Sequence, residues 1–81
     1  GCSVAILASG KDGRSFLLAM ASSDAVSRGF DAVAVVKKGA LVLGGSGGGK
    51  SHMAQAGGKD PDRINEALRV SAEEARRQLG F

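Results

Sequence analysis

Residues 44–58 read Gly-Gly-Ser-Gly-Gly-Gly-Lys-Ser-His-Met-Ala-Gln-Ala-Gly-Gly and are the most distinctive part of the chain. The 81 residues include 13 glycines, about twice the usual share of ~7%, and seven of them lie in this stretch. Because glycine has no side chain to pack in a sheet, we predict that Gly44–Lys50 is a loop. Met53–Ala56 is then a short strand, because Gly57-Gly58 leaves too little length for a helix.

The first half of this stretch also matches the phosphate-binding pattern G-x-x-x-x-G-K-[ST], over Gly44–Ser51. In such a loop, backbone amides hold phosphates, the lysine reaches them, and the serine hydroxyl binds Mg²⁺. The pattern requires a long helix directly after the loop, whereas Gly57-Gly58 interrupts the chain six residues past Ser51. We therefore expect no nucleotide triphosphatase. Two interpretations remain: a glycine backbone that approaches a phosphate closely, with Lys50 adding charge, or a flexible surface loop.

Upstream, two apolar segments predict a β-hairpin. Ser3–Ser9 is apolar and partly β-branched, which is typical of a buried strand, and Ser15–Ala21 is a second apolar strand. The turn between them contains Asp12-Gly13, a pair that tolerates positive φ. After the hairpin, Ser22-Ser23-Asp24 offers capping oxygens for one short helical turn before Gly29.

The segment Asp31–Leu43 is ambiguous from its residues alone. Its valines and the internal Gly39 favour strands. A helix is equally consistent, because apolar residues recur on one face at helical spacing. These residues are Phe30, Val33, Val36, Ala40 and Leu43.

The end of the chain predicts a helix. Asp60 is a suitable N-cap, Pro61 fits the first helical position, Asp62 places negative charge in the first turn, and Gly80 fits the position after the last turn. We expect Glu73 and Arg77 to pair on the outer side. The apolar face comprises Ile64, Ala67, Leu68, Ala72, Ala75 and Leu79.

Together these elements predict a small α/β (α+β) fold, a two-layer sandwich of one β-sheet with helices packed on it, in the order β-β-α-loop-β-α. The length leaves room for one globular domain over residues 1–81, and 43% hydrophobic with 23% charged residues is typical of a folded chain. The single cysteine, Cys2, excludes an internal disulfide and a cysteine-cluster metal site; we expect it to be a small apolar residue near the first strand. No apolar run is long enough for a membrane span and no signal peptide is visible, so we expect no membrane partner and a cytoplasmic location.

The net charge of +3 is unevenly distributed. Residues 1–59 contain seven basic and three acidic residues, whereas residues 60–81 contain four basic and five acidic ones. The basic excess therefore accompanies the glycine-rich stretch. This distribution favours a polyanionic partner such as a phosphate backbone, but charge alone is equally consistent with an ordinary, mildly basic surface. The absence of Trp and Tyr argues against a surface that reads bases by stacking them on aromatic rings.

Residues 47–59, from the three glycines and Lys50 through Met-Ala-Gln-Ala-Gly-Gly to Lys59, closely resemble the glycine-rich signature near the C-terminus of alanyl-tRNA synthetases. Asp60-Pro61 and the final helix are similar to the ending of that family. The same type of domain, the DHH-associated domain, also occurs in DHH-family phosphoesterases, where the glycine run usually ends in histidine rather than lysine. Ser51-His52 departs from the Pro-Asp that is frequent in bacterial synthetases.

The resemblance implies a C-terminal tRNA-binding domain whose partners are tRNA(Ala), the other domains of the parent synthetase and, in some members, a second copy. It implies contact with the outer corner of the tRNA and a role in coupling aminoacylation with editing. It also implies that Asp31–Leu43 is a helix. ATP, Mg²⁺ and Zn²⁺ would bind in other domains of the parent ligase, so this chain would have no cofactor and no catalytic residue of its own. The alternative is a substrate-clamping domain of a phosphoesterase.

The candidate RNA-binding residues follow from these patterns. Glycines would let the backbone approach the RNA, and lysine or arginine side chains would contact phosphates without reading the sequence. A dimerisation module that uses the final helix or a sheet edge is a third interpretation. The candidates are Gly45, Gly47, Gly48, Gly49, Lys50, Lys59, Lys37, Lys38 and Arg28.

Overall fold

The sheet starts from a two-residue turn between strands β1 (Val4–Lys11) and β2 (Arg14–Ala21). Asp12 and Gly13 have φ values of 54° and 76°, and this pair of left-handed residues matches the twist of an antiparallel hairpin. The expected hairpin is therefore confirmed in the computed structural model, which describes residues 3–80. Cys2 lies outside the described residues.

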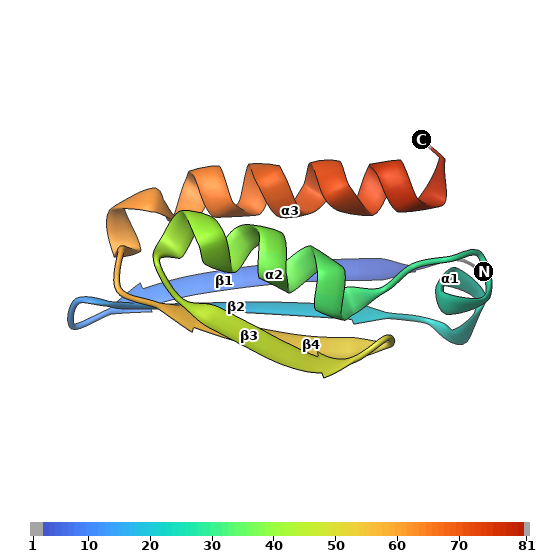
Figure 1. Ribbon diagram of the computed structural model, residues 1–81, viewed down its shortest axis with the longest axis horizontal. Coiled ribbons are helices and arrows are strands. Elements are labelled where there is room, and N and C mark those ends of the chain that lie inside the picture. Colours follow the sequence, from blue (N-terminus) through green and yellow to red (C-terminus); the bar gives the residue numbers. More distant parts are fainter. Residues whose placement is uncertain (1–2, 81) are drawn as a thin grey trace.

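The remaining elements follow in chain order as helices α1 (Ser23–Ser27) and α2 (Ala32–Leu43), strands β3 (Ser46–Lys50) and β4 (Met53–Gly58), the 3₁₀ turn η1 (Pro61–Arg63), and helix α3 (Ile64–Leu79). The four strands form one antiparallel sheet in the order β1-β2-β4-β3. Helices α2 and α3 lie side by side on one face of this sheet (Figure 1). The predicted two-layer sandwich is confirmed.

The segment Asp31–Leu43, which the sequence left open between strands and a helix, forms helix α2. Residues at both ends of the helix stabilise it. The Asp31 carboxylate accepts a hydrogen bond from the Val33 N–H at 3.1 Å, and the chain leaves the helix at Gly44 with φ 68°. Gly39 lies where the helix approaches its neighbours, because an added Cβ would be 2.3 Å from Leu17 Cδ2 and 2.6 Å from Ser71 Oγ. The glycine that suggested a strand therefore serves close helix packing.

The expected loop over Gly44–Lys50 is wrong from Ser46 onward, because Ser46–Lys50 form β3, an edge strand paired with β4. The predicted loop was based on the weak strand propensity of glycine. Tertiary pairing outweighs that propensity here, since the missing side chains let β3 lie close to β4. The strand predicted at Met53–Ala56 is confirmed and extends to Gly58.

The final helix begins differently from the prediction. Pro61 takes the first position and Gly80 ends the helix with φ 80°, both as expected. The Asp60 side chain makes no capping hydrogen bond, because a 3₁₀ turn intervenes before α3. The expected Glu73–Arg77 pair is also wrong: residues three apart are neighbours on a helix too, and Arg77 binds Glu74 while Glu73 binds Arg69.

The two faces of the sheet differ, and we call them the helix face and the open face. On the helix face, Leu17, Ala19, Ala54 and Ala56 are buried under α2 and α3, together with Phe30 and the buried side of α2. The expectation of a buried first strand is only half right, because β1 is an edge strand with one exposed face. Because side chains alternate along each strand, every second strand residue points to the open face. This set is Ala5, Leu7, Ser9 and Lys11; Arg14, Phe16, Leu18 and Met20; Ser46, Gly48 and Lys50; and Met53, Gln55 and Gly57.

A buried carboxylate joins the end of α3 to the start of α2. Glu74, only 6% exposed, accepts hydrogen bonds from Arg77 at 2.6 and 3.0 Å and from Gln78 Nε2 at 3.0 Å. The Gln78 amide oxygen in turn accepts from the Asp31 N–H at 2.8 Å. The Arg77 hydrogen bonds hold the pKa of Glu74 below its usual value, against the opposing effect of burial, and the charge of Lys38 acts in the same direction as Arg77.

We predict that Glu74→Gln lowers the free energy of unfolding by about 1 kcal/mol at neutral pH, because it removes charge-assisted hydrogen bonds from a buried group. The folded-state pKa of Glu74 is lowered, so the stability it contributes is present above its unfolded-state pKa and is lost as the pH falls through the folded one. The difference between the two proteins should therefore shrink on acidification. Urea unfolding at several pH values measures it. Glu73→Gln, which alters the exposed pair with Arg69, should have an effect near zero.

Candidate nucleic-acid interface

The glycine-rich stretch forms the outer edge of the sheet, and the need for glycine differs along it. A Cβ at Gly45 would lie 1.7 Å from the Gly57 carbonyl oxygen, and one at Gly47 would lie 2.5 Å from the Gln55 carbonyl oxygen. Gly49 has φ 151°, and its Cβ would lie 2.6 Å from the Met53 oxygen. At Gly48 an added Cβ would meet nothing within 4 Å. Packing against β4 therefore explains Gly45, Gly47 and Gly49 but does not explain Gly48.

The resemblance to a P-loop is not matched by the structure. Lys50 is followed by a turn at Ser51-His52 and by β4, so the long helix that a P-loop requires directly after the glycines is replaced by a strand. The turn is fixed by the backbone, because the Ser51 carbonyl accepts the Ala32 N–H and the His52 carbonyl accepts the Ala21 N–H, both at 2.9 Å. The backbone of Ser51-His52 thus anchors the turn to α2 and β2, and these two hydrogen bonds do not depend on the side chains that depart from the synthetase signature.

The structure brings some of the candidate cations to the glycine strand. Lys37 of α2 borders a groove with Gly45, Ser46 and Gly47. Lys50 borders a second hollow with Gly48 and Gly49, next to His52. An edge strand has unpaired backbone N–H groups, and a nearby lysine makes such an edge attractive to anions.

The other three candidate cations lie elsewhere. Lys59 follows β4 at the opposite end from Lys50, and its N–H donates to the Leu43 carbonyl at 2.9 Å. Arg28 is the C-cap of α1. Lys38 is near enough to Glu74 to lower the pKa of that carboxyl group, so it faces α3 rather than the glycine strand. The nine candidates therefore do not form one contiguous site.

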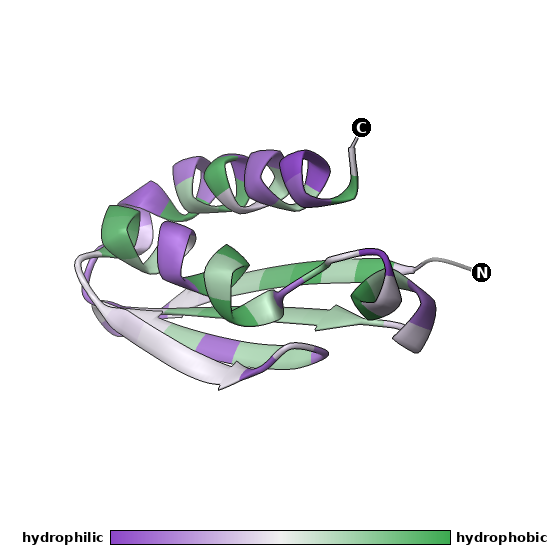
Figure 2. Cartoon of the chain, turned by 45° about the vertical axis from the view of Figure 1, so that its right-hand side comes forward, coloured by the Kyte–Doolittle hydropathy of each residue, from purple (hydrophilic) through white to green (hydrophobic). Residues whose placement is uncertain are grey.

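Sequence reasoning missed the side chains of the open face. The large apolar residues Leu7, Phe16, Met20 and Met53 are 57%, 53%, 39% and 43% exposed. Figure 2 shows that β1 and β2 are apolar over most of their length, whereas β3 is nearly neutral in hydropathy. A signal was present: β2 is apolar at consecutive positions, although only alternate residues can point to the helix face.

Residues 3–80 contain neither a cluster of metal ligands nor a membrane-spanning helix. No three His, Cys, Asp or Glu side chains within this range come together as a metal site requires. None of the helices described is both long and apolar enough to cross a bilayer.

We predict that Gly47→Ala lowers the free energy of unfolding by about 1–3 kcal/mol, because β3 must move away from β4 to admit the methyl group. Gly48→Ala should leave stability unchanged or raise it by up to ~1 kcal/mol through loss of unfolded-chain entropy. Urea unfolding of both variants measures the contrast. Equal destabilisation would contradict the assignment of Gly48 to an unobstructed position.

This chain is similar in sequence and in fold to known proteins. The DHHA1 domain model matches residues 1–77. The alanine–tRNA ligase of Natranaerobius thermophilus is 42% identical over 94% of this chain, and that of Pelotomaculum thermopropionicum is 44% identical over 98%. The C-Ala domain of Aquifex aeolicus alanyl-tRNA synthetase superposes with a TM-score of 0.77 at 33% identity, covering 89% of this chain and 63% of that one. The chain spans only 9% of the length of the two ligases.

Proposed function

The chain belongs to the DHHA1 domain family, in the form found in alanine–tRNA ligases, and from this premise we propose that it is the module with which such a ligase holds its tRNA. In this proposal residues 1–81 form one globular domain and contact the outer corner of tRNA(Ala). That contact helps aminoacylation and editing act on the same bound tRNA. In this proposal the domain acts in the cytoplasm and has no catalytic residue or cofactor. ATP, Mg²⁺ and Zn²⁺ bind to other domains of the ligase.

The observation that carries the proposal is the distribution of charge. The four strands contain Lys11, Arg14 and Lys50 and no aspartate or glutamate, so every charged residue of the sheet is cationic. All eight acidic residues lie outside the strands. A surface with this bias attracts a phosphate backbone and repels other cationic surfaces.

The glycine strand supplies the second part of the proposed contact. Lys50 and Lys37 border the hollows on either side of β3, where unpaired backbone N–H groups can donate to phosphate oxygens. Lys59 adds charge at the far end of β4. Lys38 and Arg28 have lesser roles, because neither adjoins the glycine strand.

The alternatives are less well supported. A phosphoesterase clamp shares the domain type, but the relatives compared above are ligases. Dimerisation through the apolar face of α3 is disfavoured, because Ala67 and Ala75 are buried against the core of the same chain. A sheet edge remains available for a second copy, and sedimentation at several concentrations tests it.

The test of the proposal is a titration of the 81-residue chain with tRNA(Ala) and with an RNA hairpin of equal length at low and moderate salt. We expect tighter, salt-dependent binding of the folded tRNA, because contacts to the backbone report RNA shape. Equal or absent binding of both RNAs would contradict a tRNA-holding role.

We predict that Lys50→Ala weakens the binding of all tRNAs alike and reduces the slope of log affinity against log salt by about 0.7–0.9, the loss of one phosphate contact. Lys38→Ala removes the same charge from the α3 side and is the matched control. It should leave the slope nearly unchanged. Equal effects of the two variants would show that net charge, rather than the glycine strand, determines binding.

A further inference from the structure

We propose that the open face of the sheet binds an exposed nucleobase of the RNA, in a depression beside Phe16 and Gln55. This inference rests on the proposed function and makes it more specific. It assigns base contact to the sheet face and phosphate contact to its cationic ends.

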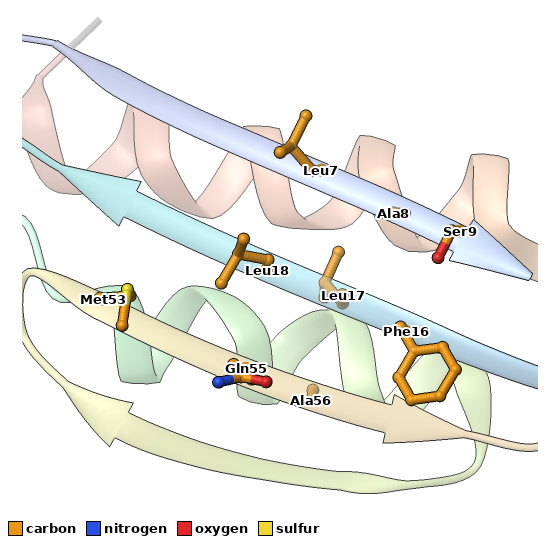
Figure 3. A pocket seen from close by; sticks show the side chains of 9 residues that line it. All are labelled: Leu7, Ala8, Ser9, Phe16, Leu17, Leu18, Met53, Gln55 and Ala56. Atoms are coloured by element: carbon orange, nitrogen blue, oxygen red, sulfur yellow. The ribbon is translucent and has the colours of Figure 1, made fainter.

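The depression lies between β1, β2 and β4 and has a volume of about 410 Å³, within the range of ~300–1,000 Å³ usual for small-ligand pockets. Figure 3 shows Leu7, Leu18, Phe16, Gln55 and Met53 projecting from the strands on the face away from the helices. Soluble domains rarely leave several large apolar side chains exposed side by side, and such patches usually mark a binding surface. The Phe16 ring supplies the aromatic surface that residue composition alone argued against.

Cross-strand registry places these side chains in rows. Leu7, Leu18, Gln55 and Gly48 lie opposite one another across the four strands. The next row is Ser9, Phe16, Gly57 and Ser46. Phe16 and Gln55 are therefore diagonal neighbours on adjacent strands, at a distance that lets one planar ligand contact both.

Glycines lie directly opposite both residues on the neighbouring strands, Gly57 opposite Phe16 and Gly48 opposite Gln55, although packing does not require glycine at either position. A Cβ at Gly48 would meet nothing within 4 Å, and one at Gly57 would make only an ordinary contact with the Ser15 oxygen at 3.7 Å. Both glycines belong to the open face. A side chain at Gly57 would project beside Phe16, and one at Gly48 would project beside Gln55, so each would crowd a flat base that contacts Phe16 and Gln55. This role explains Gly48, which strand pairing does not.

Gln55 supplies the polar group. It is exposed, and within residues 3–80 its amide has no hydrogen-bond partner, so both its donor and its acceptor are available. A side-chain amide beside an aromatic ring is suited to the edge of an unpaired base, which offers both donors and acceptors.

Charge distinguishes RNA from other occupants. Lys50 lies at one end of the open face, and Lys11 and Arg14 lie at the other, about 20 Å away along the strands. A base in the middle would thus have cations near the phosphates on both sides. A second copy of this chain would oppose one cationic face to another, and its occupancy is disfavoured for that reason.

The test uses a five-nucleotide single-stranded RNA and the same RNA with an abasic site at its centre, titrated into the 81-residue chain. We expect the intact RNA to bind about 5- to 100-fold more tightly, the usual effect of stacking one base. Phe16→Ala and Gly48→Leu should each abolish this difference. Because Phe16 is 53% exposed and Gly48 is unobstructed, neither change should prevent folding. Val70→Ala, which removes a partly exposed apolar side chain from α3 on the other side of the sheet, is the matched control and should preserve the difference.

The outcomes separate this inference from the proposed function. Equal binding of the two oligonucleotides, with tRNA binding intact, would overturn the base site and leave the tRNA-holding role standing. Loss of all RNA binding, including tRNA, would overturn both. A dimer that Phe16→Ala dissociates would assign the open face to a second copy instead.

Discussion

The close pairing of β3 with β4 is the constraint on which the rest of the structure depends. Gly45 and Gly47 permit it, because any side chain there would collide with the β4 backbone. The pairing widens the sheet beneath α2, which contacts both strands, and so completes the layer on which the helices pack. It also converts what would be a flexible loop into an ordered edge that holds Lys50 in place.

This arrangement separates two surfaces with different chemistry. One face of the sheet is buried under α2 and α3 by small and branched side chains such as Ala54 and Leu17. The opposite face keeps apolar residues in the centre and cations at the ends. Lys11, Arg14 and Lys50, the charged residues of the strands, all lie on the open face, which makes this face compatible with RNA.

Much of the fold was predictable from local signals. Asp12-Gly13 predicted the hairpin, and Pro61 and Gly80 predicted the limits of the last helical segment. That Ser46–Lys50 form a strand was not predictable, because the strand depends on pairing with β4 and a run of glycines has no local signal for such pairing. For the same reason, Lys37 and Lys50 could be named as candidates, but only the fold shows that they adjoin one strand while Lys38 does not.

The central claim is that RNA approaches the open face and the glycine edge, not the helices. Amide chemical-shift mapping of the 81-residue chain during titration with tRNA(Ala) tests it most directly. The account predicts that the perturbed amides cluster in β2, β3 and β4, while those along the outer side of α3 stay unchanged. Perturbations concentrated on α2 and α3, with the strands unaffected, would contradict it.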